Sequence, residues 1–93
     1  MMVIKVKVLV PSRKLFGVEE YIEGSSNVRS ILVRLASKYG AEFVKKVYDP
    51  VEDKLRHWIV ILKNGRNIDF TGGKLTELSN GDRLVIMTIA AGG

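Results

Sequence analysis

One amphipathic helix in a chain otherwise made of strand patterns is the feature that most limits how this sequence can fold. Apolar residues recur at helical spacing and form a single stripe: Val28, Ile31, Leu32, Leu35, Ala36 and Tyr39. Asn27 or Ser26 can cap the start of this helix by accepting an orphan backbone N–H, and Gly40 suits the left-handed residue that closes it. The stripe must be buried, and we expect it to pack on one face of a sheet.

Strand patterns flank the helix on both sides. The first strand alternates apolar and charged side chains, which is typical of a half-buried strand. The Asn64-Gly65 pair supplies the positive φ angles of a tight hairpin turn. The expected strands are residues 2–10, 15–22, 57–62, 66–70 and 83–89.

The middle of the chain is harder to interpret. Residues 41–49 are compatible with one further helical turn or with a loop that covers the core. Residues 51–56 are polar and are expected to form a loop, and residues 75–78 one helical turn. We therefore expect an α+β fold of the β-grasp (ubiquitin-like) type. About five strands form a mixed sheet on one main helix, and the first and last strands run parallel.

Composition excludes several classes of function. The chain has no cysteine and a single histidine, His57, so we expect no disulfide, no thiolate chemistry, no metal site and no cofactor. No apolar run approaches the ~20 residues of a membrane span, and the N-terminal segment lacks the apolar run of a signal peptide. A single domain over residues 1–93 is expected in the cytoplasm, away from membranes.

The formal net charge of +5 is concentrated in the first half of the chain. Residues 1–46 carry nine Lys and Arg against four Glu, whereas residues 47–93 carry six basic and six acidic residues. The basic residues are not interleaved with aromatic ones, so a nucleic-acid partner is not expected. A solvated surface is the favoured interpretation, and a protein partner with an acidic surface is the other.

Two glycines, Gly92 and Gly93, follow directly on the last apolar strand. Residues without Cβ atoms fit a narrow channel in any backbone conformation. One interpretation makes the carboxylate of Gly93 the working group at the end of a flexible tail, about residues 90–93. The other treats the tail as incidental.

Several of these segments together resemble the MoaD/ThiS-type ubiquitin-like sulfur carriers, a family that includes the small subunit of molybdopterin synthase. The similar segments are Asn27–Leu32, Ile61–Arg66, Leu75–Leu78, Asn80–Leu84 and the terminal Ala91-Gly92-Gly93. The chain departs from the MoaD pattern in having no proline before the tail and in being basic. Archaeal ubiquitin-like modifiers share the same fold and ending.

The resemblance implies what the tail does. An E1-like ATP-dependent adenylyltransferase of the MoeB/ThiF type would adenylate Gly93, and sulfur transfer would convert it to a thiocarboxylate. A MoaE-like large subunit, or another acceptor enzyme, would then take the sulfur, most simply for molybdopterin, the precursor of the Mo/W cofactor. The chain itself would be a carrier and not an enzyme.

A docking surface is also expected. If Leu84 and Ile86 face the helix, Val85 and Met87 face outward, and Val60 and Leu62 do so on the neighbouring strand. These four residues, with Ala91 and Gly92 of the tail, are the predicted partner-binding residues, and Lys5 and Lys7 would border them. A register slip by one residue would exchange the faces.

Two further functions remain open at this stage. The same tail could be conjugated to target lysines, which would make the chain a ubiquitin-like modifier. The chain could also be a non-covalent interaction domain whose Gly-Gly ending is incidental.

Overall fold

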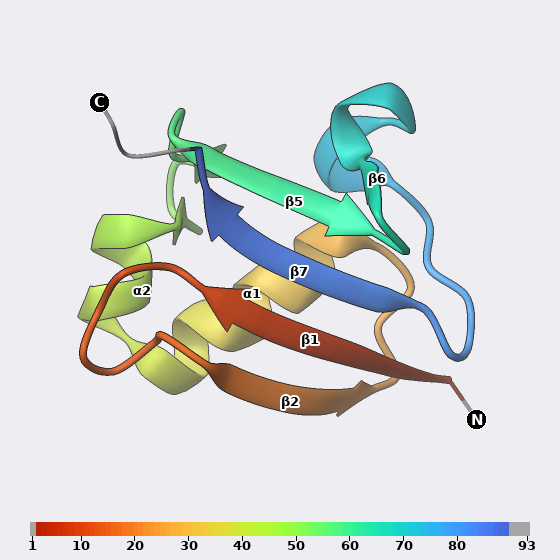
Figure 1. Cartoon of the computed structure of the whole chain (residues 1–93), viewed down its shortest axis with the longest axis horizontal. Coiled ribbons are helices and arrows are strands. Elements are labelled where there is room, and N and C mark those ends of the chain that lie inside the picture. Colours follow the sequence, from red (N-terminus) through yellow and green to blue (C-terminus); the bar gives the residue numbers. More distant parts are fainter. Residues whose placement is uncertain (1, 90–93) are drawn as a thin grey trace.

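A five-stranded mixed sheet forms the body of the protein, and the computed structural model describes it within residues 2–89 (Figure 1). Its strands are β1 (Val3–Leu9), β2 (Val18–Glu23), β5 (Ile59–Lys63), β6 (Arg66–Asn67) and β7 (Arg83–Thr88). Their order in the sheet is β2-β1-β7-β5-β6. β1 and β7 run parallel at the centre, and the other neighbours are antiparallel. The expected β-grasp arrangement is confirmed.

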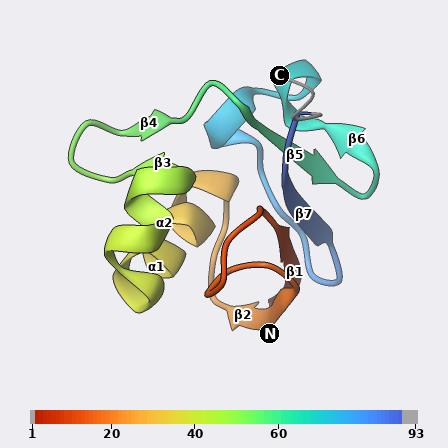
Figure 2. The same ribbon diagram turned by 60° about the vertical axis from the view of Figure 1, so that its left-hand side comes forward.

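Two helices cover one face of this sheet, as the turned view shows (Figure 2). α1 spans Val28–Tyr39 and α2 spans Ala41–Lys46. Asn27 caps α1, because its side-chain oxygen accepts from the Ser30 N–H at 2.9 Å while the Ser30 hydroxyl accepts from the Asn27 N–H at 3.4 Å. Such a cap contributes about 1 kcal/mol. Gly40 ends the helix with a φ of 67°, which a side chain would disfavour.

The core lies between the sheet and the two helices. Phe43 and Val47 are completely buried, so the segment after α1 is a helical turn that also closes the core. In the strands the inward residues alternate with outward ones, as period-two patterns require. The buried apolar residues include Ile4, Val6, Val8, Ile31, Leu32, Leu35, Phe43, Tyr48, Ile61, Leu84 and Ile86.

Three expected elements differ from the structure. The second strand begins at Val18, because residues 11–17 form a turn from which Leu15 fills the core with its side chain fully buried. β6 has two residues, and a 3-10 helix, η1 (Ile68–Phe70), replaces the rest of the expected strand. The helical turn expected at residues 75–78 is instead η2 (Gly73–Leu75).

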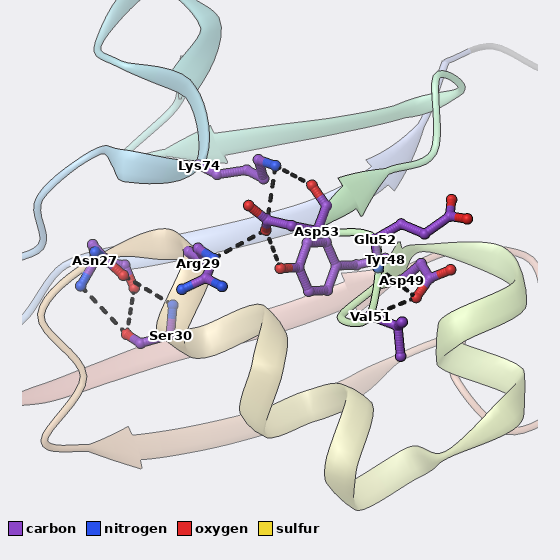
Figure 3. A network of polar contacts seen from close by, with 9 residues as sticks. All are labelled: Asn27, Arg29, Ser30, Tyr48, Asp49, Val51, Glu52, Asp53 and Lys74. Carbon is purple, nitrogen blue, oxygen red and sulfur yellow. Dashed lines mark hydrogen bonds and ion pairs between the residues drawn. The ribbon is translucent and has the colours of Figure 1, made fainter.

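A small hairpin stands where a loop was expected. β3 (Tyr48–Asp49) pairs with β4 (Lys54–Leu55) in an antiparallel ladder. Figure 3 shows how Asp53 fixes its turn. The carboxylate accepts hydrogen bonds from the Tyr48 hydroxyl and from Arg29 Nε at 3.0 Å, and Lys74 Nζ lies 3.3 Å away. The hairpin is thereby tied to the start of α1 and to η2.

The Asp53 contacts make a pH-dependent contribution to stability. Hydrogen bonds from Tyr48, and next from Arg29, lower the pKa of Asp53 from 3.8 to about 2. Because the folded pKa lies below the unfolded one, this stabilisation is present above 3.8 and is lost as the pH falls through about 2. We expect the difference in unfolding free energy between the wild type and Asp53→Asn, measured by urea denaturation, to shrink across that window.

The control for this experiment is Asp69→Asn, which removes an exposed carboxylate that forms no ion pair with another residue within 2–89. Its effect on stability should be small at every pH. A difference for Asp53→Asn that stays constant from neutral pH to about 2 would contradict the prediction.

Candidate docking face

The sheet face that points away from α1 carries an apolar patch where three neighbouring strands meet. We define the apolar patch as Leu9, Val60, Leu62, Val85 and Met87, all half-buried. Residues directly opposite each other share a face, and the register pairs Leu62 with Val85 and Val60 with Met87. The patch is therefore continuous across β5 and β7.

The strand register expected from the sequence is confirmed. Leu84 and Ile86 are 1% and 0% exposed, and Ile59 and Ile61 are buried beside them, so their neighbours face outward. The structure thus places Val60, Leu62, Val85 and Met87 together on the outer face. Whether a partner binds them stays a prediction.

Leu9 belongs to the same patch and was not among the predicted residues. It is the last outward residue of β1, and the parallel register places it opposite Met87. The signal was present in the alternation of β1, in which Val3, Lys5, Lys7 and Leu9 share one face. This alternation could place Leu9 in the patch only if β7 was known to lie beside β1. That pairing joins residues almost eighty positions apart, such as Leu9 and Met87.

Charged side chains border the apolar patch on the side of β2. Lys5 and Lys7 each lie 3.8 Å from a carboxylate oxygen of Glu19. These three residues and Arg83 line, with Leu84 and Val85, a hollow of about 230 Å³ on the outer face. The sheet face therefore has an apolar half and a charged half, which is the composition of a protein-binding surface with a polar rim.

The base of the tail lies at the edge of this face. The Ile89 N–H donates to the Trp58 carbonyl at 2.8 Å, which extends the contact between the final strand and β5 by one step. The Trp58 indole N–H in turn donates to the Lys46 carbonyl at 2.9 Å. The predicted site residues Ala91, Gly92 and Gly93 lie outside the described residues.

The described part of this face presents the apolar patch and, beside it, the charge pairs of Lys5 and Lys7 with Glu19. Within residues 2–89, no helix has both the length and the apolar character needed to cross a bilayer.

Comparison with known proteins identifies relatives over nearly the whole chain. The model of the ThiS family matches residues 6–93. The curated proteins provide no match.

Several solved structures share the fold. The small archaeal modifier protein 1 of Methanosarcina acetivorans is 28% identical with a TM-score of 0.75, and the match covers 100% of this chain and 98% of that one. A chain in the BexX/CysO complex of Amycolatopsis orientalis is 26% identical with a TM-score of 0.73, covering 97% and 99%. Urm1 of Trypanosoma brucei, at 23% identity and a TM-score of 0.74 over 98% and 95%, supports the fold alone. These neighbours are ubiquitin-like proteins of the small carrier and modifier type.

Proposed function

The chain belongs to the ThiS family, and on that premise we propose that it is a cytoplasmic sulfur carrier whose Gly93 carboxylate is activated and converted to a thiocarboxylate. The observation that carries the proposal is the extent of the family match, which runs to residue 93 and so includes the Gly-Gly ending. The docking face supports it, because a carrier needs a binding surface beside its reactive end.

The chemistry follows from the weak reactivity of a carboxylate. One oxygen of the Gly93 carboxylate attacks the α-phosphorus of ATP, pyrophosphate leaves, and an acyl-adenylate remains. A sulfide equivalent from a sulfur donor then displaces AMP, so that a C–S bond replaces a C–O bond. The E1-like partner supplies the ATP site, and this chain supplies the tail and the surface that positions it.

Intact-mass measurement tests this proposal directly. The chain is expressed with the E1-like adenylyltransferase and the sulfur donor of its source, and the mass of the recovered protein is determined. We expect a species heavier by the exchange of one oxygen for one sulfur, and this species should disappear when Gly93 is deleted. Recovery of the unmodified mass alone, under conditions where the partner is active, would contradict the carrier proposal.

The most specific form of the proposal places the sulfur in molybdopterin. The chain would then be the non-catalytic small subunit of a molybdopterin synthase, and a MoaE-like large subunit would receive its tail. Supplying the thiocarboxylated chain to a purified MoaE-like subunit and the pterin precursor should yield molybdopterin. Sulfur transfer to a thiamine or tRNA pathway instead would change the acceptor and leave the carrier role intact.

Conjugation to lysines is the second candidate, favoured by the similarity to a small archaeal modifier protein. A carrier is released after each cycle, whereas a modifier ends in an isopeptide bond. Epitope-tagged chain recovered from its native cell should therefore run mainly as the free species, whose mass is 10.4 kDa plus that of the tag. A dominant ladder of heavier, thiol-resistant adducts that requires Gly93 would make the modifier the better interpretation.

Met87→Asp should weaken docking strongly while leaving the fold intact. The substitution places a charge at the centre of a patch that a partner has to desolvate, and the loss at such positions is typically 2 kcal/mol or more, which is about a 30-fold rise in Kd. Because Met87 faces outward and is half-buried, the thermal unfolding midpoint should change little. Calorimetric titration with the E1-like enzyme measures the affinity.

Tyr21→Asp is the matched control for this variant. Tyr21 lies opposite Lys5 on the same sheet face, is 67% exposed, and is outside the apolar patch. The same charge introduced there should leave the affinity nearly unchanged. Equal binding by Met87→Asp and the wild type would show that the apolar patch is not the docking surface.

A further inference from the structure

Five cationic side chains belong to segments at the same end of the molecule as the end of β7. We define them as the basic collar: Arg13, Lys14, Lys45, Lys46 and Arg56. They come from the β1–β2 connection, from α2 and from the segment between β4 and β5. In Figure 1 the β1–β2 connection, α2 and the end of β7 all lie at the left end of the longest axis.

Side-chain contacts bring these segments together. The Ser12 hydroxyl donates to Glu42 Oε2 at 2.7 Å, which holds the connection that carries Arg13 and Lys14 against α2. The Arg56 guanidinium donates to the Val44 carbonyl from two nitrogens, at 3.2 and 2.9 Å. These contacts fix Arg56 and the segments that carry the other members of the collar.

The tail base is attached to the same structure. Trp58 accepts from the Ile89 N–H through its carbonyl and donates to the Lys46 carbonyl through its indole. One residue thus links the last described residue of the chain to the C-terminal end of α2. A molecule that contacts the tail base at Ile89 therefore lies near the end of α2 that carries Lys45 and Lys46.

The positive charge at this end is not balanced from within the chain. The ion pairs among the described residues use Lys5, Lys7, Arg29, Lys38 and Lys74, and none uses a member of the collar. Apart from the ion-paired Asp53, the acids in or between the collar segments are Glu42, whose carboxylate accepts from Ser12, and Asp49 and Glu52 of the β3–β4 hairpin. Five cations against these three carboxylates leave an excess of positive charge at this end.

We propose that the basic collar docks on an acidic surface that rims the tail entrance of the activating enzyme, and that it steers the tail toward that entrance. This inference rests on the proposed function and names the chemistry of the partner surface that the function needs. Complementary charge around a docking site raises the rate of encounter more than it raises the final affinity. The collar would act before the tail is seated, and the apolar patch afterwards.

A protein fits this surface better than a nucleic acid does. The collar borders the apolar patch, since Leu9 ends β1, which leads into the connection that carries Arg13 and Lys14, and Met87 lies opposite Leu9. An apolar centre with a charged rim is typical of protein interfaces. Trp58, the aromatic residue nearest the tail base, is 39% exposed and has its indole N–H engaged with Lys46, and its ring edge contacts His57.

The test is the variant Lys14→Glu/Lys45→Glu, compared with the control Lys54→Glu/Arg66→Glu. All four side chains are exposed, and both variants change the net charge equally. ATP–pyrophosphate exchange by the E1-like enzyme of the same source is measured against carrier concentration at several salt concentrations. For the collar variant we expect KM to rise about tenfold at low salt with kcat unchanged, and this difference to fall below about twofold near 0.5 M salt, where screening is short-ranged.

The outcomes separate the two proposals. If the wild-type chain supports no ATP–pyrophosphate exchange, both the proposed function and the collar proposal are wrong. If the wild type supports exchange and the collar variant has the same KM as the control variant, only the collar proposal is wrong. Tight binding of a labelled polyuridine oligonucleotide that the collar variant loses, without a change in KM, would assign the surface to RNA instead. Thermal unfolding of both variants shows that the fold is retained.

Discussion

Removal of Gly93 is expected to abolish activation of the chain while its stability stays unchanged. Shortening the tail by one residue withdraws the carboxylate by roughly 3.5 Å, and displacement of a reacting atom by even about 1 Å can reduce a rate 100-fold. ATP–pyrophosphate exchange with the E1-like enzyme should therefore fall to the background seen without carrier. Residues 2–89 form a closely packed core that includes residues from both helices and the sheet, so thermal unfolding should not change.

Two further variants sharpen this experiment. Adding one alanine after Gly93 keeps both glycines but moves the carboxylate, and it should be inactive for the same reason. Replacing Gly93 with a bulky residue keeps the chain length and tests the width of the channel. Exchange by the deletion variant at the wild-type rate would contradict both the carrier and the modifier proposals.

Phe43→Ala should be among the most destabilising single substitutions in the chain, at about 3–5 kcal/mol. Phe43 belongs to α2, a helix of six residues, and its side chain is completely buried between that helix and the sheet. The loss combines the apolar area returned to water with the cavity that a short, anchored helix cannot close. Urea denaturation of the purified variant measures the free energy of unfolding.

Phe70→Ala is the matched control, because it removes the same atoms at a site that is 83% exposed. Its cost should be within about 0.5 kcal/mol, as for most surface substitutions. Comparable losses in the two variants would mean that α2 does not close the core as the structure shows.

Local chemistry explains which elements were predictable from the sequence. The bounds of α1 follow from Asn27 and Gly40, whose capping roles depend on residues within one helical turn. The Asn64-Gly65 turn adopts φ angles of 50° and 85°, as its composition requires. Neither of these inferences needed knowledge of the rest of the fold. The period of a strand predicts that Val85 and Met87 share a face. Which face points outward rests on analogy with the fold, because residues 84–87 are all apolar.

The elements that were missed depend on contacts between distant segments. The β3–β4 hairpin reads as a polar loop because its stability comes from Arg29 and Lys74, which reach Asp53 from α1 and η2. Leu15 resembles a strand residue, yet it fills the core from a turn. Leu9 joins the apolar patch only through the parallel pairing of β1 with β7. The proposed role of Gly93 depends on a second molecule: the glycine tail suggested a working carboxylate, and the chemistry proposed for it came from the resemblance.

The central position of β7 also determines how the domain responds to mechanical load. A protein that pulls on the tail applies force along the axis of β7, which is held by β1 on one side and by β5 on the other. With the force parallel to the strands, the hydrogen bonds of both ladders are loaded together in shear and are not broken one at a time. The domain should therefore resist being drawn through a pore from this end, whereas traction on the edge strand β2 would peel the sheet apart.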